Sequence, residues 1–102
     1  MIYFIADTIK DVVKIGVSKS PKKRLKQLQT SNSNKLVLLG FIDGEKEQEK
    51  YLHNLFGKHK LSGEWFCLND EIIDHLNSVN LIDCFVGRID GKVYCLKKMK
   101  NF

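Results

Sequence analysis

Apolar runs and polar stretches alternate along the first part of the chain in a pattern that predicts three β-strands. Residues 1–6 and 12–17 are apolar and rich in β-branched or aromatic side chains, and the polar segment 7–11 between them indicates a hairpin. Residues 35–42 are nearly all apolar, which is typical of a strand that is covered on both faces. We therefore expect this third strand to be central in the sheet.

A first helix is predicted over residues 21–30. Ser20 precedes it as a suitable N-cap, and Pro21 occupies the first helical position, where proline is best tolerated. Leu25 and Leu28 have the spacing of an inward face, so the lysines around them would face water.

A second helix is predicted from residue 45 to about residue 59, and Gly57 weakens its end. Its apolar side chains are three and four residues apart, as the inner stripe of an amphipathic helix requires. These inward residues are Leu52, Leu55 and Phe56.

The remaining sequence predicts a third helix and a second hairpin. The segment SGEWFCL indicates a short turn into an extended piece. Residues 70–79 would form the helix, with Asn69 as its cap and two acids in its first turn. Residues 84–97 are two β-rich runs joined by Asp90-Gly91, a strong hairpin signal. The inward face of the third helix would hold Ile72, Ile73 and Leu76.

Together these elements predict an α+β fold (mixed α/β) in a single domain, because 102 residues suffice for one modest core. We expect a small antiparallel sheet of about three strands flanked by helices, in the order β-β-α-β-α-α. The extended piece would precede the last helix, and a C-terminal β-hairpin would follow it. Residues 1–83 would form the core, and residues 84–102 the hairpin extension of the same domain.

The cysteine content and hydropathy indicate a cytoplasmic protein. The three cysteines show no CxxC pair and no even framework, which favours reduced thiols over disulfides or a zinc site. No apolar stretch approaches the roughly 20 residues that span a bilayer, so we expect no membrane association. The N-terminus also lacks the basic region of a signal peptide.

The net charge of +5 is unevenly distributed along the chain. Residues 1–40 hold eight Lys/Arg against two Asp, residues 41–83 hold four against nine acids, and residues 84–102 hold five against one. Two basic ends therefore flank an acidic middle, which can place a polyanion-attracting face beside a group of carboxylates. The alternative is a lysine-rich protein that does not bind nucleic acid.

The first hairpin offers a candidate pair of reactive side chains. If its turn centres on Thr8 and Ile9, Tyr3 lies directly opposite Lys14 on the same face of the sheet. An ammonium group next to a buried phenol favours the phenolate, so Tyr3 could act as a base.

The basic cluster that follows contains an informative arginine. The chain has fifteen lysines and only two arginines, and Arg24 lies within the lysine run. A guanidinium can grip two oxygens of a phosphodiester, whereas a lysine is a point charge. Gly16, eight residues earlier, would let a backbone or a phosphate approach the strand closely. The surrounding Lys19, Lys22, Lys23 and Lys26 would follow a nucleic-acid backbone without reading its sequence.

The second helix offers a candidate metal ligand. Glu49 and His53 are four residues apart, so they share a face that continues toward the core. Glu49 could hold one Mg²⁺, and the alternative is an ordinary surface pair. Glu45 and Glu47 are weaker candidates. Trp65 is interpreted, with the phenylalanine after it, as a core aromatic that packs against this helix.

Several of these segments together resemble the GIY-YIG nuclease superfamily. The segments are MIYFI, then VKIGVS, then SPKKRLKQLQT, and finally EKYLHNLF with LSGEWF. The similarity covers roughly residues 1–76 and is greatest to the small branch, common in phages and other DNA viruses, whose second motif is KIG. Their order and spacing are more specific than any one of the segments.

The resemblance implies a role for each matching residue. Tyr3 matches the candidate general base, and Lys14 and Gly16 match the outer positions of the second motif. Arg24 matches the arginine that contacts the scissile phosphate. The acidic metal ligand corresponds to Glu49, the histidine of the KIG branch to His53, and the aromatic of the GEWF element to Trp65. Two departures are Met1 in place of the first glycine and Lys14 in place of a tyrosine.

The function expected from these residues is metal-dependent hydrolysis of DNA by an endonuclease of the GIY-YIG type, with Mg²⁺ or another divalent cation as cofactor. DNA is the first choice of partner and RNA the second, and a viral protein would act in the host cytoplasm. One alternative is a binding module on the same fold without catalysis. Another is an unrelated interaction protein whose terminal hairpin pairs with a partner or a second copy.

Overall fold

The computed structural model describes residues 1–79, 84–89 and 92–97, and only the backbone of the last two segments. Its elements in chain order are β1 (Ile2–Asp7), β2 (Val12–Val17), α1 (Pro21–Thr30), β3 (Leu36–Ile42), α2 (Lys46–Leu55), the 3₁₀ turn η1 (Gly57–His59), β4 (Lys60–Ser62), β5 (Trp65–Cys67), α3 (Asp70–Ser78), β6 (Cys84–Ile89) and β7 (Lys92–Lys97). The predicted α+β class is confirmed. The predicted order is wrong in one respect, because residues 60–67 form the hairpin of β4 and β5, where SGEWFCL was expected to form a turn into a single extended piece.

Five antiparallel strands form the main sheet, in the spatial order β3-β1-β2-β5-β4. The expectation of about three strands was therefore too low. The prediction that the third strand is central is also wrong, because β3 lies at an edge. Its apolar sequence reflects the covering of its faces, which says nothing about whether both of its hydrogen-bonding edges are paired.

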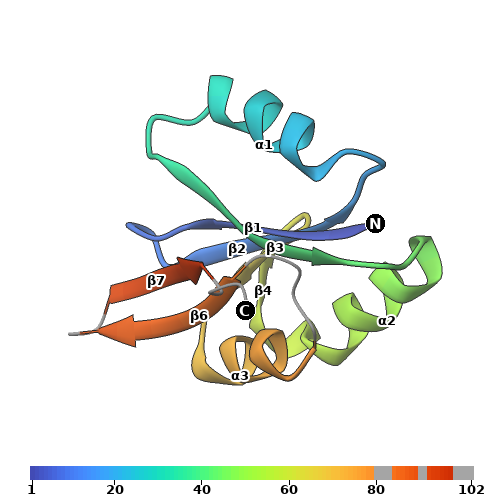
Figure 1. Cartoon of the computed structure of the whole chain (residues 1–102). Helices are drawn as coiled ribbons and strands as arrows, with labels where there is room; N and C mark the ends of the chain where they lie inside the picture. The colour runs from blue at the N-terminus through green and yellow to red at the C-terminus, as the bar shows by residue number, and fades with distance from the viewer. Residues whose placement is uncertain (80–83, 90–91, 98–102) are drawn as a thin grey trace, which may run out of the picture.

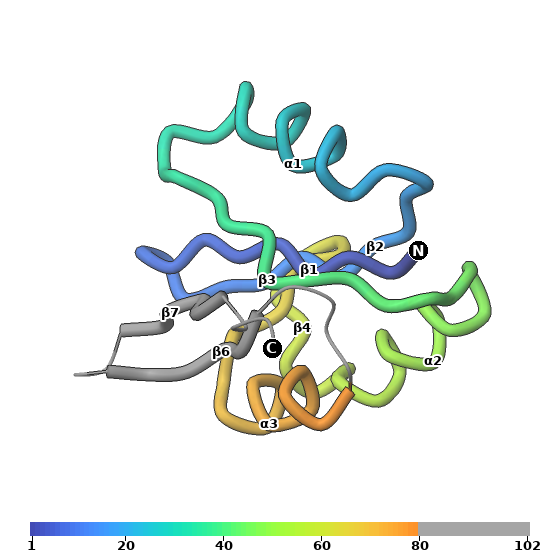
Figure 2. Tube along the Cα trace, in the orientation of Figure 1, coloured from blue at the N-terminus to red at the C-terminus, as the bar shows by residue number. Residues whose placement is uncertain are grey.

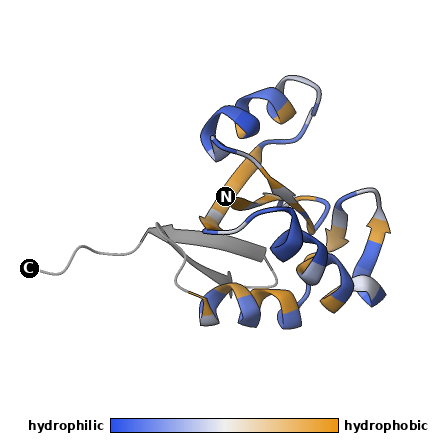
Figure 3. Ribbon diagram, turned by 90° about the vertical axis from the view of Figure 1, so that its right-hand side faces the viewer, coloured by the Kyte–Doolittle hydropathy of each residue, from blue (hydrophilic) through white to orange (hydrophobic). Residues whose placement is uncertain are grey.

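Helices cover both faces of the sheet (Figure 1), with α1 on one side and α2 and α3 on the other. The Cα trace in Figure 2 follows the chain through these layers in the same view. All six residues of β1 are buried, as a strand between two helical layers requires. Figure 3 shows apolar residues concentrated in the strands and on the inner sides of the helices.

The two faces of β1 contribute to two separate apolar clusters. The cluster under α2 and α3 includes Phe4, Ile15 and Phe56. The smaller cluster under α1 contains Tyr3 and Ile5, with partly buried residues from α1 and β3 packed against it. Tyr3 is thus on the α1 side of the sheet.

The β1–β2 hairpin has a longer loop than the sequence suggested. Asp7 pairs with Val12, so four residues separate the strands. The Asp7 carboxylate accepts hydrogen bonds from the backbone N–H groups of Ile9 (3.1 Å) and Lys10 (3.0 Å), which fixes this loop. The turn centre predicted at Thr8 and Ile9 is therefore wrong, and every ladder pair is shifted by two residues.

The helices begin and end largely where the sequence predicted. Ser20 occupies the N-cap position of α1, but its hydroxyl makes no capping bond. Helix α2 ends earlier than predicted, before Gly57, and it begins after a capping box in which Glu45 is the N-cap. Leu55 was predicted to face inward, yet it is 41% exposed, because the helix ends at this residue. Asn69 caps α3 through a hydrogen bond from the Ile72 N–H (3.0 Å).

The two C-terminal strands form their own two-stranded antiparallel sheet. Their register pairs Ile89 with Lys92, as the predicted hairpin requires. The predicted turn residues Asp90 and Gly91 lie outside the described residues.

Candidate active site

The later half of β2 forms an open edge of the main sheet, because β5 pairs only with its first half. The Ile15 N–H donates to the Glu64 carbonyl oxygen (3.1 Å), and Nε2 of His53 lies 2.8 Å from the Ile15 carbonyl oxygen. The Glu49 carboxylate accepts a hydrogen bond from the Val17 N–H. The predicted position of Glu49 and His53, at the border between helix and sheet, is confirmed, and both are half-buried.

Tyr3 and Gly16 are directly opposite each other in the β1–β2 ladder. A Cβ atom at Gly16 would come within 3.0 Å of the Cζ atom and of a neighbouring ring carbon of Tyr3. Only glycine leaves room for this ring. The ring of Tyr3 occupies the space beside Gly16 into which we had expected a backbone or a phosphate to come. Gly16 therefore positions the tyrosine.

The predicted pairing of Tyr3 with Lys14 is wrong. Lys14 is opposite Ile5, two residues along the ladder from the expected partner. Its Nζ atom instead forms an ion pair with Oε1 of Glu64 (3.3 Å) and lies 5.5 Å from the centroid of the Trp65 ring. Lys14 still shares the α1 side of the sheet with Tyr3, because a shift by two residues preserves the face.

Arg24 reaches this part of the sheet from α1. Its Nε–H points at the Tyr3 hydroxyl oxygen at 3.5 Å, the upper limit for a hydrogen bond. Its Nη1 atom donates to Oε1 of Gln27 (3.2 Å). The guanidinium is half-buried, so part of it remains open to a ligand.

The environment of Tyr3 raises the pKa of its hydroxyl above the usual value. Burial is the largest cause, and the carboxylates of Glu64 and Glu49 add to it, while Arg24 acts in the opposite direction. The expectation of a readily formed phenolate is therefore wrong for the protein without ligands. Tyr3 is a neutral phenol that can donate a hydrogen bond.

Three side chains form a group that could hold a metal ion. Ligand atoms of Glu49, His53 and Glu64 all lie within 4.8 Å of one another, and each residue is half-buried. Glu49 and His53 come from α2, whereas Glu64 comes from the turn between β4 and β5. Carboxylate oxygens suit Mg²⁺ and Mn²⁺, and an imidazole nitrogen suits other divalent metals.

The crowding of two acids at this place supports a cationic ligand. The pKa of Glu49 is raised above its usual value. Burial is the largest cause, and the nearby Glu64 carboxyl group adds to it. Two carboxylates this close repel each other when both are ionised. A divalent cation would relieve this repulsion, so the donor set fits such an ion.

The match with a family model places the chain among known domains. The T5orf172 domain model matches residues 1–82, which is most of the chain. The chain belongs to the T5orf172 domain family. This family is of phage origin and related to the GIY-YIG nucleases. No curated protein and no solved structure matches the chain significantly.

In this T5orf172 domain, one member of the candidate site was missed by the sequence analysis. Glu64 was considered only as part of a turn before the aromatic pair. The available signal was an acid directly before Trp65, in a chain that already had Glu49 and His53 on one helix face. Sequence alone could not place that turn beside α2, because hairpin β4–β5 was itself not foreseen.

The lysines predicted to follow a nucleic-acid backbone lie on the outside of the T5orf172 domain. All four are exposed, on α1 and on the segment before it: Lys19, Lys22, Lys23 and Lys26. They belong to the same helix region as Arg24. Trp65, predicted to be a core aromatic, is only half-buried and packs near Lys14. Among the residues that the structure describes, no helix has the length and apolar character needed to cross a membrane.

Proposed function

We propose that this T5orf172 domain is an endonuclease that hydrolyses phosphodiester bonds of DNA with the help of a divalent cation. The observation that supports this proposal is the gathering of unlike groups at one sheet edge. Arg24 reaches Tyr3 on the α1 side, and the carboxylates of Glu49 and Glu64 influence the pKa of the same tyrosine. Arg24, Tyr3 and the two carboxylates therefore belong to one electrostatic neighbourhood, which supports their acting on one phosphate.

The two carboxylates are the best candidates for holding the cation. Glu49 and Glu64 approach each other closely and carry the oxygen ligands that Mg²⁺ prefers. When bound, such a cation supplies Lewis-acid stabilisation of the negative charge on the phosphoryl oxygens. Lys14, which pairs with Glu64, helps to neutralise the acidic group.

His53 is a better candidate than Tyr3 to accept a proton from the attacking water. A carbonyl oxygen only accepts hydrogen bonds, so in neutral His53 the nitrogen at 2.8 Å from the Ile15 carbonyl carries the proton. Nδ1 then holds the free electron pair. The hydrogen bond thus fixes the tautomer and leaves one nitrogen able to act as a base.

Arg24 and Tyr3 would bind the phosphate itself. The guanidinium can donate two hydrogen bonds to the oxygens that gain charge, and the neutral phenol can donate a third. Losing one such contact typically costs roughly 10²–10³ in rate. The exposed lysines of the α1 region would attract the backbone of DNA without reading its sequence, and RNA is the alternative substrate.

Nicking of supercoiled plasmid DNA tests the proposal. We expect nicking with Mg²⁺, none with EDTA, and a large loss for Arg24→Ala and Glu49→Gln. Activity that persists in both variants would come from a contaminant and would contradict the proposal. Parallel assays on single-stranded DNA and RNA define the substrate.

A second candidate function is binding without catalysis, and one contact favours it. The Lys14 ammonium lies 3.3 Å from Glu64, where it can serve as an internal counter-cation at the acidic group. A domain of this kind would bind nucleic acid in a salt-dependent way and would leave plasmid intact with every divalent cation tested. Absence of binding at low salt would instead leave a protein partner, or a second copy through the terminal hairpin.

A further inference from the structure

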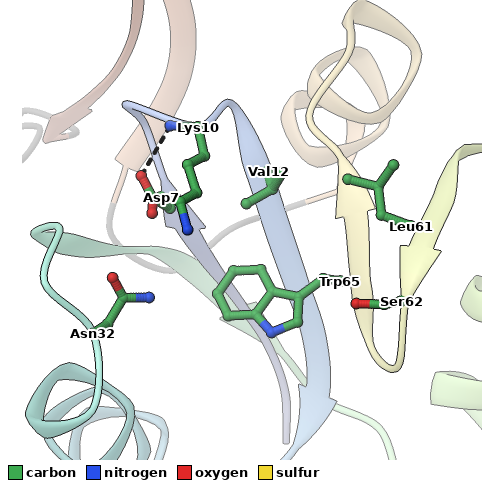
Figure 4. Close-up of a pocket in the computed structure, with 7 residues that line it drawn as sticks. All are labelled: Asp7, Lys10, Val12, Asn32, Leu61, Ser62 and Trp65. Atoms are coloured by element: carbon green, nitrogen blue, oxygen red, sulfur yellow. Dashed lines mark hydrogen bonds between the residues drawn. The ribbon is translucent and has the colours of Figure 1, made fainter.

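A cavity of about 290 Å³ lies on the α1 side of the sheet, next to the candidate active site. Its walls come from three parts of the chain: the β1–β2 hairpin, the loop between α1 and β3, and the β4–β5 hairpin. Figure 4 shows the residues that line it, which are Asp7, Lys10, Val12, Asn32, Leu61, Ser62 and Trp65. The wall is therefore part aromatic and aliphatic, and part polar.

The indole of Trp65 is the largest apolar surface in this wall. In Figure 4 it lies between Asn32 on one side and Leu61 and Ser62 on the other. Trp65 is half-buried, and Leu61 is 60% exposed at the rim. A rigid aromatic ring at the side of an open cavity is suited to stacking on another planar ring.

Asn32 presents hydrogen-bond donors beside this ring. Its Oδ1 atom accepts a hydrogen bond from the backbone N–H of Asn34 (2.9 Å), which only an oxygen can do. Its Nδ2 group is therefore the donor, and it makes no hydrogen bond to another described residue. Figure 4 shows the amide directed toward the cavity. An amide NH₂ at this place can donate to a carbonyl oxygen or a ring nitrogen of a bound molecule.

The loop that carries Asn32 is held rigidly. Asp7, which is 1% exposed, accepts a hydrogen bond from Nδ2 of Asn34 (2.9 Å) and from two N–H groups of its own hairpin. Gln29 donates to the carbonyl oxygens of Asn32 (3.2 Å) and Asn34 (2.8 Å). The cavity is therefore preorganised, and little ordering remains when a ligand binds.

The cavity adjoins the acidic group through a short chain of contacts. Trp65 follows Glu64 directly, and Lys14 lies between the two side chains, 3.3 Å from the carboxylate and 5.5 Å from the ring centroid. With a divalent cation at the acidic group, a phosphate bound there would thus place the attached nucleoside near Trp65.

From these relationships we propose that the cavity binds one unstacked nucleobase of the nucleic-acid strand, next to the phosphate held at Arg24 and the acidic group. The base stacks on Trp65 and accepts a hydrogen bond from Asn32. This inference rests on the proposed function for the position of the strand, but it concerns binding alone. It implies that the protein binds the strand where a base is not stacked in a double helix, as in a single-stranded, flipped or branched region.

Fluorescence of Trp65 reports on this directly, because it is the only tryptophan of the chain. The wild-type protein is titrated, with Ca²⁺ in place of Mg²⁺, with short single-stranded oligonucleotides and with an abasic oligonucleotide of the same length and charge. We expect the base-bearing strands to quench the emission and to bind at least about fivefold more tightly than the abasic strand. Equal quenching or equal affinity for both would overturn the proposal, as would the absence of binding.

Two variants separate the stacking contact from the hydrogen bond. Affinity is measured by anisotropy of labelled strands, and the readout is the ratio of base-bearing to abasic binding. We expect Trp65→Phe to keep most of the ratio and Trp65→Leu to lose it. Asn32→Asp keeps the acceptor for Asn34 and removes the donor, so it should lower the ratio, whereas a ratio unchanged in both Trp65→Leu and Asn32→Asp would contradict the proposal.

The outcome is independent of cleavage. Cleavage without a base-dependent ratio would refute the base pocket and leave the nuclease proposal intact. A base-dependent ratio in a protein that never cleaves would refute the nuclease proposal and support the pocket.

Discussion

The phenol ring of Tyr3 lies directly over Gly16, its partner in the β1–β2 ladder. The glycine lacks the Cβ atom that would otherwise collide with the ring, and Arg24 approaches the hydroxyl from α1. The glycine of the VKIGVS segment therefore has a packing role, which fixes where the tyrosine presents its hydroxyl.

Gly16→Ala should destabilise the protein because its methyl group would overlap with the Tyr3 ring. Overpacking of this kind costs roughly 1–3 kcal/mol, and each kcal/mol lowers Tm by about 4–8 °C in a domain of this size. The matched control is Gly57→Ala, since a Cβ atom at that position would have no described neighbour within 4 Å. Thermal denaturation of both variants checks this, and equal Tm values would contradict the packing role.

The two acids at the sheet edge predict stabilisation by divalent cations. An ion that binds only the folded state at about 100 times its Kd adds about 2.7 kcal/mol of stability. We expect Mg²⁺ or Mn²⁺ to raise the Tm of the wild type, and to do so much less for Glu49→Gln and Glu64→Gln. Glu47→Gln, on the exposed side of the same helix, is the control that should respond like the wild type. An equal response in all four proteins would place the ion elsewhere.

The raised pKa of Glu49 predicts how stability depends on pH in the absence of metal. Between the ordinary value of about 4.5 and the raised value, the folded state binds more protons than the unfolded chain, so the free energy of unfolding falls as pH rises. Glu49→Gln cannot titrate at this position. We expect this variant to gain stability relative to the wild type as pH rises through that window. The two proteins should lose this difference below pH 4.5, and parallel curves would contradict the assignment.

Asp7 should be a strong determinant of stability at neutral pH. Burial alone would raise the pKa of Asp7, but hydrogen bonds from Lys10, Asn34 and Ile9 hold it below the ordinary value. Its contribution is therefore present above about pH 3.8 and is lost as pH falls through the lowered pKa. Asp7→Asn would oppose an amide donor to the Asn34 amide and should cost about 1–3 kcal/mol in denaturant unfolding. Asp43→Asn, at an exposed site, should cost little, and equal losses would contradict this role of Asp7.

The sequence predicted the helices and strands more accurately than it predicted which of them lie next to each other. Residues such as Leu52 and Ile72 were assigned to the core from local spacing, which periodicity determines directly. Local spacing could not predict how the strands pair. The partner of Tyr3 depends on the length of the β1–β2 loop, which the Asp7 side chain fixes, and β3 lies at the sheet edge although its sequence is apolar.

The candidate site shows the same division between local and long-range information. Glu49 and His53 share a helix face, so their proximity could be predicted from a spacing of four. Glu64 joins them from a separate hairpin, and Trp65 borders a cavity whose other wall lies in the α1–β3 loop. These relationships are set by the tertiary packing of distant segments.

Arg24→Lys would separate the geometric role of the guanidinium from its charge. The lysine keeps the charge but loses the planar fork that can bind two oxygens of one phosphate. We expect a fall of about 10² or more in cleavage rate, with little change in binding at low salt. Lys26→Ala, two residues further along α1 at an exposed position, should instead weaken binding a few-fold and only in a salt-dependent way. Equal cleavage by Arg24→Lys and the wild type would remove Arg24 from the transition state.

The most direct test of the central claim is the single-turnover rate of DNA cleavage by Glu64→Gln and by the wild type, each with Mg²⁺ and with EDTA. The account predicts cleavage by the wild type that requires the cation, and a loss of about 10² or more in the variant, whose folding is checked by its Tm. It would be contradicted by a Glu64→Gln protein that cleaves as fast as the wild type, or by wild-type cleavage that continues in EDTA.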